Sequence, residues 1–481
     1  MPMGLILFGI LITIYRVGAL FIADLPLFFD EAYYFSWSQN LDFGYYSKPP
    51  LIAWLIAITT WSCGTSELCI RAPALLIHPL TASGIFFVAR DLYGYQVGKY
   101  AALIYLTLPM IFASSWIIST DVLLLLFWTY SLYFLVRALE KDYWKDWLGL
   151  GICLGLGLLS KYTMIAFLLS SISYLLLVQQ HRCYLYRIKL YVALFIALTI
   201  FLPNLIWNFT HDLISLKHTA QNAAFERAWF YPHRFLEFIL GQMLVFGPIL
   251  SGILISALSK NPLNNKDWRH QLLLALGLPL LIIMSFEAFL TRANANWAAP
   301  SYLTLTILIA AWGHTIPGRI RFIHAALALN LFLGVVGYHF DFLSQIFIGN
   351  ELPRRFDPYA RLRGWRELAA YLEKWFAKYP NAGLLGDDRA FLAELNYYLR
   401  PKMIAAWNPS GVISDQYQLT VPLIKHDQHE YLFVARTTDF RQISAHFRAA
   451  QDLGKIKLPT HSDSALECRV YWVHNFLGYQ P

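Results

Sequence analysis

The sequence predicts a polytopic α-helical membrane protein that carries a soluble α/β domain at its C-terminal end. Of its 481 residues, 57% are hydrophobic and only 14% are charged, whereas soluble domains have about a quarter charged residues. Apolar runs of about 20 residues recur, which is the length that crosses a hydrocarbon core of about 30 Å. A membrane β-barrel would instead show alternating segments of roughly ten residues.

Eleven apolar runs in the first two thirds of the chain are each expected to form a membrane span. They cover 4–23, 70–89, 98–114, 121–138, 147–159, 162–178, 189–206, 236–258, 270–290, 298–312 and 322–338. With this number of spans, five loops share one side of the membrane: 90–99, 139–146, 179–189, 259–269 and 313–321. These loops hold more Lys and Arg than the longer loops opposite. The positive-inside bias therefore puts the N-terminus in the cytoplasm and everything after residue 338 outside.

The first outer loop, residues 24–69, is long and is expected to be structured. Residues 31–40 predict a short amphipathic helix, and the apolar run 49–61 is too short to span. That run is therefore expected to lie in the plane of the membrane interface. Cys63 and Cys69 flank a short polar turn, and the compartment that the loop faces decides between a disulfide and two free thiols.

From about residue 340 the pattern changes to alternating helices and strands. Helices are expected at 364–378, 388–399 and 438–450, and strands at 383–386, 403–407, 430–435 and 468–474. This alternation predicts an α/β domain over residues 339–481, which follows the transmembrane domain of residues 1–338. The predicted topology places this domain on the outer, periplasmic side.

Six charged residues that are costly in a membrane protein fall on the outer side of this topology: Asp30, Glu31, Lys48, Asp121, Lys161 and Arg292. A transporter or flippase of lipid-linked saccharide, which is the alternative function, would place ionisable groups at mid-membrane depth and relate two halves by a repeat. A receptor-like interaction protein would leave the carboxylates unexplained. Charges at one face favour chemistry at the outer membrane surface.

Asp30 and Glu31 directly follow two phenylalanines in the first outer loop. Neighbouring residues on a helix point about 100° apart, so one carboxylate acts and the other supports it. Asp30 is either a general base at the membrane boundary or the N-cap of the helix 31–40.

The remaining charges have two interpretations each. Lys48 precedes two prolines and either binds a lipid phosphate as a point charge or anchors the interface. Asp121 begins the fourth span, where it joins the site or complements the positive end of the helix. Lys161 and Arg292 either help Lys48 to offset charge on a departing phosphate or act as interfacial anchors.

Aromatic and amide side chains complete the candidate substrate contacts. Tyr33, Tyr45 and Tyr46 lie in the first outer loop, where they stack on a sugar or join the interfacial belt. Asn296 and Trp297 hydrogen-bond a sugar or phosphate, or cap a helix. The cysteines show no metal-binding spacing, and the chain has no glycine pattern of a nucleotide site.

Four motifs resemble the C-superfamily of membrane glycosyltransferases. They are Asp30-Glu-Ala-Tyr-Tyr, Gly44-Tyr-Tyr-Ser-Lys-Pro-Pro-Leu-Ile-Ala-Trp, Ser119-Thr-Asp and Gly157-Leu-Leu-Ser-Lys-Tyr. The pattern covers roughly residues 20–300. Within the superfamily it resembles the bacterial lipid A aminoarabinose transferases and the dolichyl-phosphate-mannose protein mannosyltransferases.

The resemblance implies an inverting enzyme of the cell envelope, in the bacterial inner membrane. Such an enzyme moves a sugar from a polyprenyl-phosphate donor to a lipid, glycan or protein acceptor on the outer side, and lipopolysaccharide is one such acceptor. In the family, the aspartate matching Asp30 is the essential acid/base or acceptor-orienting residue. The lysine matching Lys48 contacts the donor phosphate, and the aspartate matching Asp121 belongs to the site.

The sequence departs from the aminoarabinose transferases at two positions of the first loop. Tyr33 stands where they have an arginine, and Ser47 where they have a glutamate. These departures argue against carrying over their metal site or aminoarabinose as the sugar. We therefore assign no metal ligands and no cofactor, and the need for a divalent ion stays open.

Overall fold

The computed structural model describes residues 1–222, 230–259, 267–349 and 352–479. The loop expected at 259–269 thus lies partly outside the described residues. The chain separates into two compact units that do not follow the order of the sequence. Unit 1 comprises Met1–Ile22, Lys48–Ile52 and Arg71–His339, and unit 2 comprises Ala23–Ser47, Ala53–Ile70 and Phe340–Pro481.

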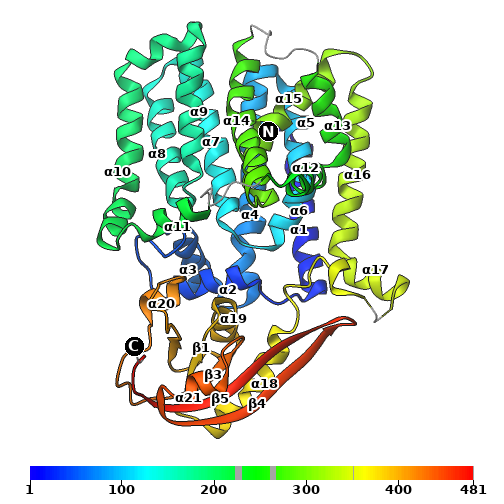
Figure 1. Ribbon diagram of the computed structural model, residues 1–481. Helices are drawn as coiled ribbons and strands as arrows, with labels where there is room; N and C mark the ends of the chain where they lie inside the picture. Colours follow the sequence, from blue (N-terminus) through cyan, green and yellow to red (C-terminus); the bar gives the residue numbers. More distant parts are fainter. Residues whose placement is uncertain (223–229, 260–266, 350–351, 480–481) are drawn as a thin grey trace. The chain divides into compact units, whose positions relative to one another are not determined.

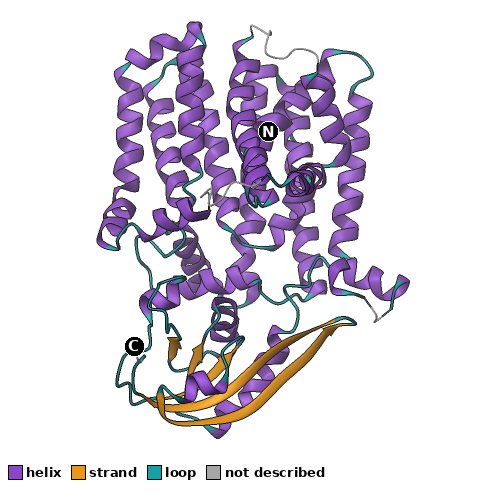
Figure 2. Ribbon diagram, viewed as in Figure 1, coloured by secondary structure: helices purple, strands orange, loops and turns teal. Residues whose placement is uncertain are grey.

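The described part of unit 1 is helical, whereas the strands lie in unit 2 (Figure 2). The helices of unit 1 are α1 (Met3–Ala23), α4 (Glu67–Tyr93), α5 (Tyr95–Thr107), α6 (Pro109–Trp116), α7 (Thr120–Lys141), α8 (Trp144–Ser160), α9 (Met164–Leu177), η1 (Gln179–Tyr186), α10 (Ile188–Thr210), α11 (Ile214–Asn222), α12 (Pro232–Phe246), α13 (Pro248–Leu258), α14 (Trp268–Leu290), η3 (Ala295–Ala298), α15 (Ser301–Thr315) and α16 (Ile320–Tyr338). The last residue of α1, Ala23, and the first residues of α4 belong to unit 2.

The apolar runs are helical, as expected, and the polytopic α-helical class is confirmed. Within the described residues, 6 helices are long and apolar enough to cross a membrane, or up to 9 if each bent pair is one span. The expected count of eleven is not reached by this measure. Helices α8 and α15 occupy two of the expected runs but have 17 and 15 residues.

Two expected spans are bent pairs of helices rather than single rods. The run 98–114 forms α5 and α6, which meet at 56°, and the run 236–258 forms α12 and α13, which meet at 108°. Each second helix begins with a proline, which has no N–H to continue the preceding helix. Gly247 precedes the second of these prolines with φ of 100°, a conformation that favours glycine.

A buried arginine holds α1 to the bend between α5 and α6. Arg16 is 0% exposed, and its Nη2 donates to the carbonyl of Leu106 at 2.7 Å. The bend interrupts the helical ladder here, and a carbonyl without a partner is costly inside a membrane. The indole N–H of Trp116 in turn donates to the Arg16 carbonyl at 3.1 Å. Sequence analysis did not single out Arg16, whose contacts show a structural role.

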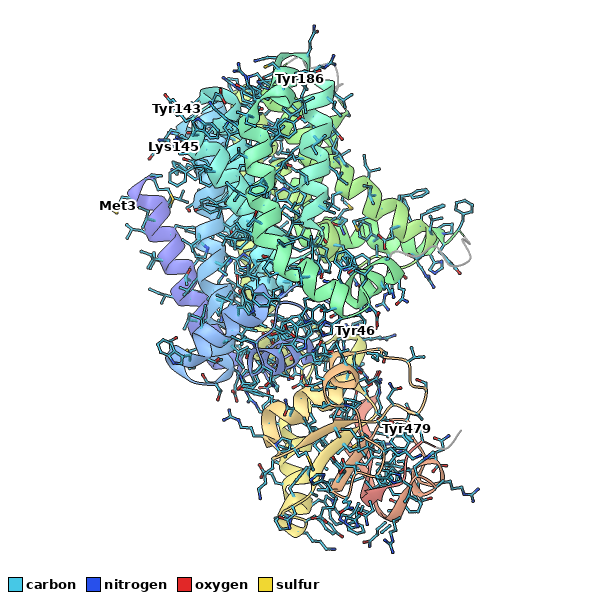
Figure 3. All side chains as sticks on the ribbon, turned by 90° about the vertical axis from the view of Figure 1, so that its left-hand side faces the viewer. Met3, Tyr46, Tyr143, Lys145, Tyr186 and Tyr479 are labelled. Atoms are coloured by element: carbon cyan, nitrogen blue, oxygen red, sulfur yellow. A yellow bond between two sulfur atoms is a disulfide. The ribbon has the colours of Figure 1, made fainter. Side chains whose placement is uncertain are left out.

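Loops expected on one side of the membrane gather at one end of unit 1. The Tyr184 hydroxyl donates to the Leu139 carbonyl at 2.9 Å, and Lys189 Nζ lies 2.9 Å from Asp142 Oδ2. Tyr143, Lys145 and Tyr186 stand at this same end (Figure 3). Helix α7 starts at the opposite end, about 30 Å away for its 22 residues.

Unit 2 contains a mixed sheet with the strand order β2-β1-β3-β5-β4. Strand β1 is parallel to β2 and β3, while β5 is antiparallel to β3 and β4. The last two strands form a long curved hairpin (Figure 1). The elements are α2 (Phe29–Ser38), α3 (Leu51–Cys63), α17 (Phe340–Phe347), η4 (Arg354–Phe356), α18 (Trp365–Lys378), β1 (Gly383–Gly386), α19 (Arg389–Leu399), β2 (Ile404–Ala406), α20 (Gln416–Thr420), β3 (Glu430–Ala435), α21 (Phe440–Ser444), β4 (Phe447–His461) and β5 (Ser464–Phe476).

The expected C-terminal α/β domain is confirmed, with one element wrong. The helix predicted at 438–450 ends at Ser444, and strand β4 begins at Phe447. This strand pairs with β5 from Phe447 opposite Phe476 to His461 opposite Ser464. Most of its residues are at least partly exposed, so no apolar run marks it in the sequence. Its backbone pairing with β5 decides the conformation.

One arginine holds both ends of the first outer loop. Arg366 on α18 binds the carboxylate of Glu67, and its Nη1 lies 2.9 Å from Asp24 Oδ2. The Tyr398 hydroxyl donates to Glu67 Oε1 at 2.6 Å. Near the end of the loop, Cys63 and Cys69 form a disulfide. Residues of the C-terminal region therefore fix the shape of the loop.

A buried carboxylate secures the start of the C-terminal region. The Asp357 side chain is 0% exposed, and Arg363 Nε and His461 Nε2 lie 2.5 and 3.0 Å from its Oδ2. Burial raises the pKa of Asp357, but hydrogen bonds from Arg363, His461 and the Tyr359 N–H outweigh it, so the pKa lies below its ordinary value.

The Asp357→Asn variant should lower the melting temperature at pH 7, because a depressed folded-state pKa stabilises the fold above the unfolded value of about 4. That contribution is lost as the pH falls through the folded-state pKa. The difference in melting temperature from wild type, measured by intrinsic fluorescence in detergent, should shrink between pH 7 and pH 3. Glu373→Gln, at an exposed position of α18, is the control and should change the melting temperature little. A difference as large at pH 3 as at pH 7 would contradict the assignment.

Candidate functional site

Three predicted residues from separate segments of unit 1 come together. Asp121 Oδ1 lies 2.6 Å from Lys161 Nζ, and Asn296 Nδ2 donates to Asp121 Oδ2 at 2.8 Å. The side chains of Asp121 and Lys161 are 12% and 13% exposed. An ion pair so far removed from water loses hydration on both partners, and the hydrogen bond from Asn296 to the carboxylate offsets part of this cost.

The helices of unit 1 explain this meeting. Asp121 lies in the first turn of α7 and Lys161 directly follows α8. These two helices pack antiparallel along their length, so the start of one meets the end of the other (Figure 1). Asn296 lies in η3. This short helix is held in place by Gln242 of α12, whose Nε2 donates to the Ala295 carbonyl at 3.1 Å.

Both carboxylate oxygens of Asp121 therefore bind side chains from other segments. Its role is thus not confined to complementing the positive end of α7. Lys161 points toward Asp121 rather than to the surface. Lys48 and Arg292 belong to the same unit but make no ion pair with Asp121 within the described residues. Lys48 is half-buried and Arg292 is exposed, while Trp297 is half-buried next to Asn296.

In unit 2, helix α2 begins earlier than expected and this changes the role of its two acids. The N-cap residue is Phe28, so Asp30 lies in the first turn and is not the N-cap. Glu31 Oε2 accepts a hydrogen bond from the Phe28 N–H at 2.9 Å. A glutamate at this third helical position commonly reaches back to the cap. Glu31 is 0% exposed and therefore supports the helix.

Asp30 is half-exposed and forms an ion pair with an arginine that sequence analysis missed. Arg389 Nη2 lies 3.4 Å from Asp30 Oδ1. Its guanidinium also lies over the rings of Phe29 and Tyr33, at 5.4 and 5.1 Å from their centroids. Burial lowers the pKa of Arg389, but Asp30 and the nearby tyrosines raise it above its ordinary value. Arg389 therefore stays charged beside Asp30.

The three tyrosines predicted to contact substrate are buried. Tyr33, Tyr45 and Tyr46 are 1%, 2% and 7% exposed. The Tyr33 hydroxyl accepts from the Gln416 N–H, and the Gln416 side-chain oxygen accepts from the Tyr46 N–H at 2.6 Å. Tyr45 stacks on Trp37 with ring centroids 4.6 Å apart. Burial raises the pKa of Tyr45 to about 12. In this structure these tyrosines fix the fold of the first loop.

Sequence analysis also missed a carboxylate in unit 1. Glu287, near the end of α14, is 6% exposed, and its Oε1 has no hydrogen-bond partner in the described part of the chain. The sequence does mark this residue, because Glu287 is the lone acid of the apolar run 270–290. Arg389 carried no such signal, since it stands in an ordinary polar helix start.

The side chains around Asp121 do not suit a cation site. Its two neighbours, the Lys161 ammonium and the Asn296 amide N–H, are both donors, whereas hard divalent ions need several oxygen ligands. Within the described ranges, no three His, Cys, Asp or Glu side chains gather as metal ligands would.

Comparison with known proteins agrees with the fold and with the motifs. Residues 47–207 match the family of dolichyl-phosphate-mannose-protein mannosyltransferases. The chain is 31% identical over 420 residues to the lipid A galacturonosyltransferase RgtD of Rhizobium johnstonii, which covers 84% of this chain and 85% of that protein.

Solved structures of ArnT from Cupriavidus metallidurans share the fold over 98% of both chains. The apo form superposes with a TM-score of 0.65 at 13% identity. The form bound to undecaprenyl phosphate superposes with a TM-score of 0.62 at 15% identity. The identity to RgtD across most of both proteins, together with this fold, shows that the chain belongs to the C-superfamily of membrane glycosyltransferases.

Proposed function

We propose that this glycosyltransferase moves a sugar from a polyprenyl-phosphate donor to a lipid acceptor of the cell envelope, with inversion. The observation that carries the proposal is the half-exposed carboxylate of Asp30 in the first outer loop. It is paired with Arg389 of α19. Two relatives support it: RgtD is a lipid A galacturonosyltransferase, and ArnT was solved with undecaprenyl phosphate bound. Membership of a transferase family leaves no ground for the flippase alternative.

We place the reaction on the periplasmic side of the bacterial inner membrane. The loops 139–146 and 179–189 lie at one end of unit 1, and their Lys and Arg residues favour the cytoplasm for that end. The Cys63–Cys69 disulfide in the first outer loop agrees with an oxidising compartment on the other side.

On the donor side, the bond from the sugar's anomeric carbon to the phosphate oxygen breaks, and its electron pair stays on the phosphate. Lys48 and Arg292 would stabilise this charge. Lys161 shares its charge with Asp121, so its part is to hold Asp121 and Asn296 in place as well as to attract the phosphate. Asn296 and Trp297 would contact the sugar or the phosphate.

On the acceptor side, Asp30 accepts the proton of an acceptor hydroxyl as that oxygen attacks the anomeric carbon from the face opposite the phosphate. This direction of attack inverts the configuration. If the acceptor is itself a phosphate, Asp30 only orients it. Glu31 does not substitute for Asp30, because it caps α2.

The Asp30→Asn variant should lose sugar transfer by at least about a hundredfold, which is the usual contribution of a general base. Transfer would be followed by mass spectrometry of cell-envelope lipids, which would also identify the sugar and the acceptor. Asp212→Asn is the matched control, because this exposed carboxylate lies in unit 1 away from the first outer loop and should leave transfer near normal. Near-normal transfer by Asp30→Asn, with equal expression and insertion, would remove Asp30 from the catalytic role.

The Lys48→Ala variant should raise the KM for the polyprenyl-phosphate donor by roughly tenfold or more, because a charge-assisted contact to phosphate is lost. Lys48→Arg should recover part of the loss. Lys141→Ala, at the far end of α7, is the control for removal of one positive charge. An unchanged donor KM in Lys48→Ala would exclude the phosphate contact.

The Arg389→Ala variant should lower kcat by roughly tenfold and move the acidic limb of the pH–rate profile to higher pH, because a carboxylate without its cationic neighbour is harder to keep ionised. Arg389→Lys retains the charge and should restore the limb toward wild type. Arg448→Ala on exposed β4 is the control. If Arg389→Ala changed the melting temperature but left the pH profile unmoved, Arg389 would be a structural residue only.

A further inference from the structure

Unit 2 contains a pocket of about 480 Å³ between the segment 354–365, the start of α19 and the β4–β5 hairpin. This volume falls within the range of small-molecule sites. Four arginines line it, namely Arg354, Arg361, Arg363 and Arg436, and we call it the arginine pocket. Phe29, the residue before Asp30, also lines it.

The charge of the arginine pocket is not balanced by its own acids. Glu467 is the acid among the described lining residues, and it is already paired with Lys455 and Lys457 at 2.6 and 3.1 Å. Glu467 is therefore already neutralised, and the charge offered to a ligand comes from those lining arginines that have no carboxylate partner.

The four arginines divide into two paired and two unpaired side chains. Arg363 is bound by Asp341 and Asp357, and Arg436 Nη1 lies 2.7 Å from Asp388 Oδ2.

Arg354 and Arg361 have no carboxylate partner for their guanidinium groups within the described residues. Arg354 Nη1 donates to the Ser464 hydroxyl at 3.3 Å, and Asp463 accepts from the Arg354 backbone N–H instead. Arg361 is exposed at the pocket. Unpaired guanidinium forks are suited to bind phosphate with two parallel hydrogen bonds.

We propose that the arginine pocket binds a phosphate-bearing saccharide through Arg354 and Arg361. The volume suits a sugar phosphate, and the pocket reaches Phe29 beside Asp30, so the bound group would be the headgroup of the acceptor held near the candidate base. This inference rests on the proposed function. The same chemistry occurs in a lipid headgroup and in a soluble sugar phosphate.

The test uses the full-length protein in detergent and the Arg354→Ala/Arg361→Ala double variant. Ligand-observed NMR would measure binding of N-acetylglucosamine 1-phosphate, with N-acetylglucosamine as the uncharged probe. Wild type should prefer the phosphate, and the double variant should bind it at least about tenfold more weakly, because two charge-assisted contacts are lost. Arg355→Ala is the matched control: this exposed neighbour lies over the Phe356 ring, outside the pocket lining.

A second arm measures transfer to lipid A in phospholipid vesicles. The double variant should raise the KM for the acceptor while kcat stays near wild type. If the double variant raises the acceptor KM and the wild type does not bind the soluble probe, the pocket is supported and its ligand is the lipid headgroup. Equal probe binding and equal KM in wild type and double variant would overturn the pocket. Absence of transfer in wild type would exclude lipid A as the acceptor, and the probe measurement would still decide the pocket.

Discussion

The first outer loop depends on one guanidinium group, that of Arg366, which binds Asp24 at the beginning of the loop and Glu67 near its end. Exposed ion pairs stabilise proteins by only about 0–1 kcal/mol. Here Arg366 is partly buried and makes two hydrogen bonds to Glu67, which also accepts from Tyr398. The loop that carries Asp30 is thus closed by the C-terminal region, which explains why these distant segments form one compact unit.

The same region supplies a positive charge beside Asp30. The related aminoarabinose transferases have an arginine where this chain has Tyr33. Here Arg389 from α19 lies on the face of the Tyr33 ring and pairs with Asp30. A cation therefore stands beside the candidate carboxylate, and it comes from a segment far along the chain.

The sequence predicted those features that local pattern determines. Apolar runs marked the helices, and short motifs marked Asp30 and Asp121. The bend at Gly247 and the strand β4 escaped prediction. A Gly-Pro pair inside an apolar run reads as part of one span, and a mostly exposed strand has no apolar run. Partners such as Asn296 for Asp121 depend on packing between distant segments. No local signal shows which polar residues will meet.

The hairpin of β4 and β5 leaves β4 as the outermost strand of the sheet. Such a strand exposes backbone groups to which a foreign chain can add, and this is a common route to aggregation. Lys455 and Lys457 stand along β4, and the pairing shifts register near Gly454. Ammonium groups and an irregular ladder both disfavour strand addition. Both features protect the open edge of β4 against cross-strand association with neighbouring chains.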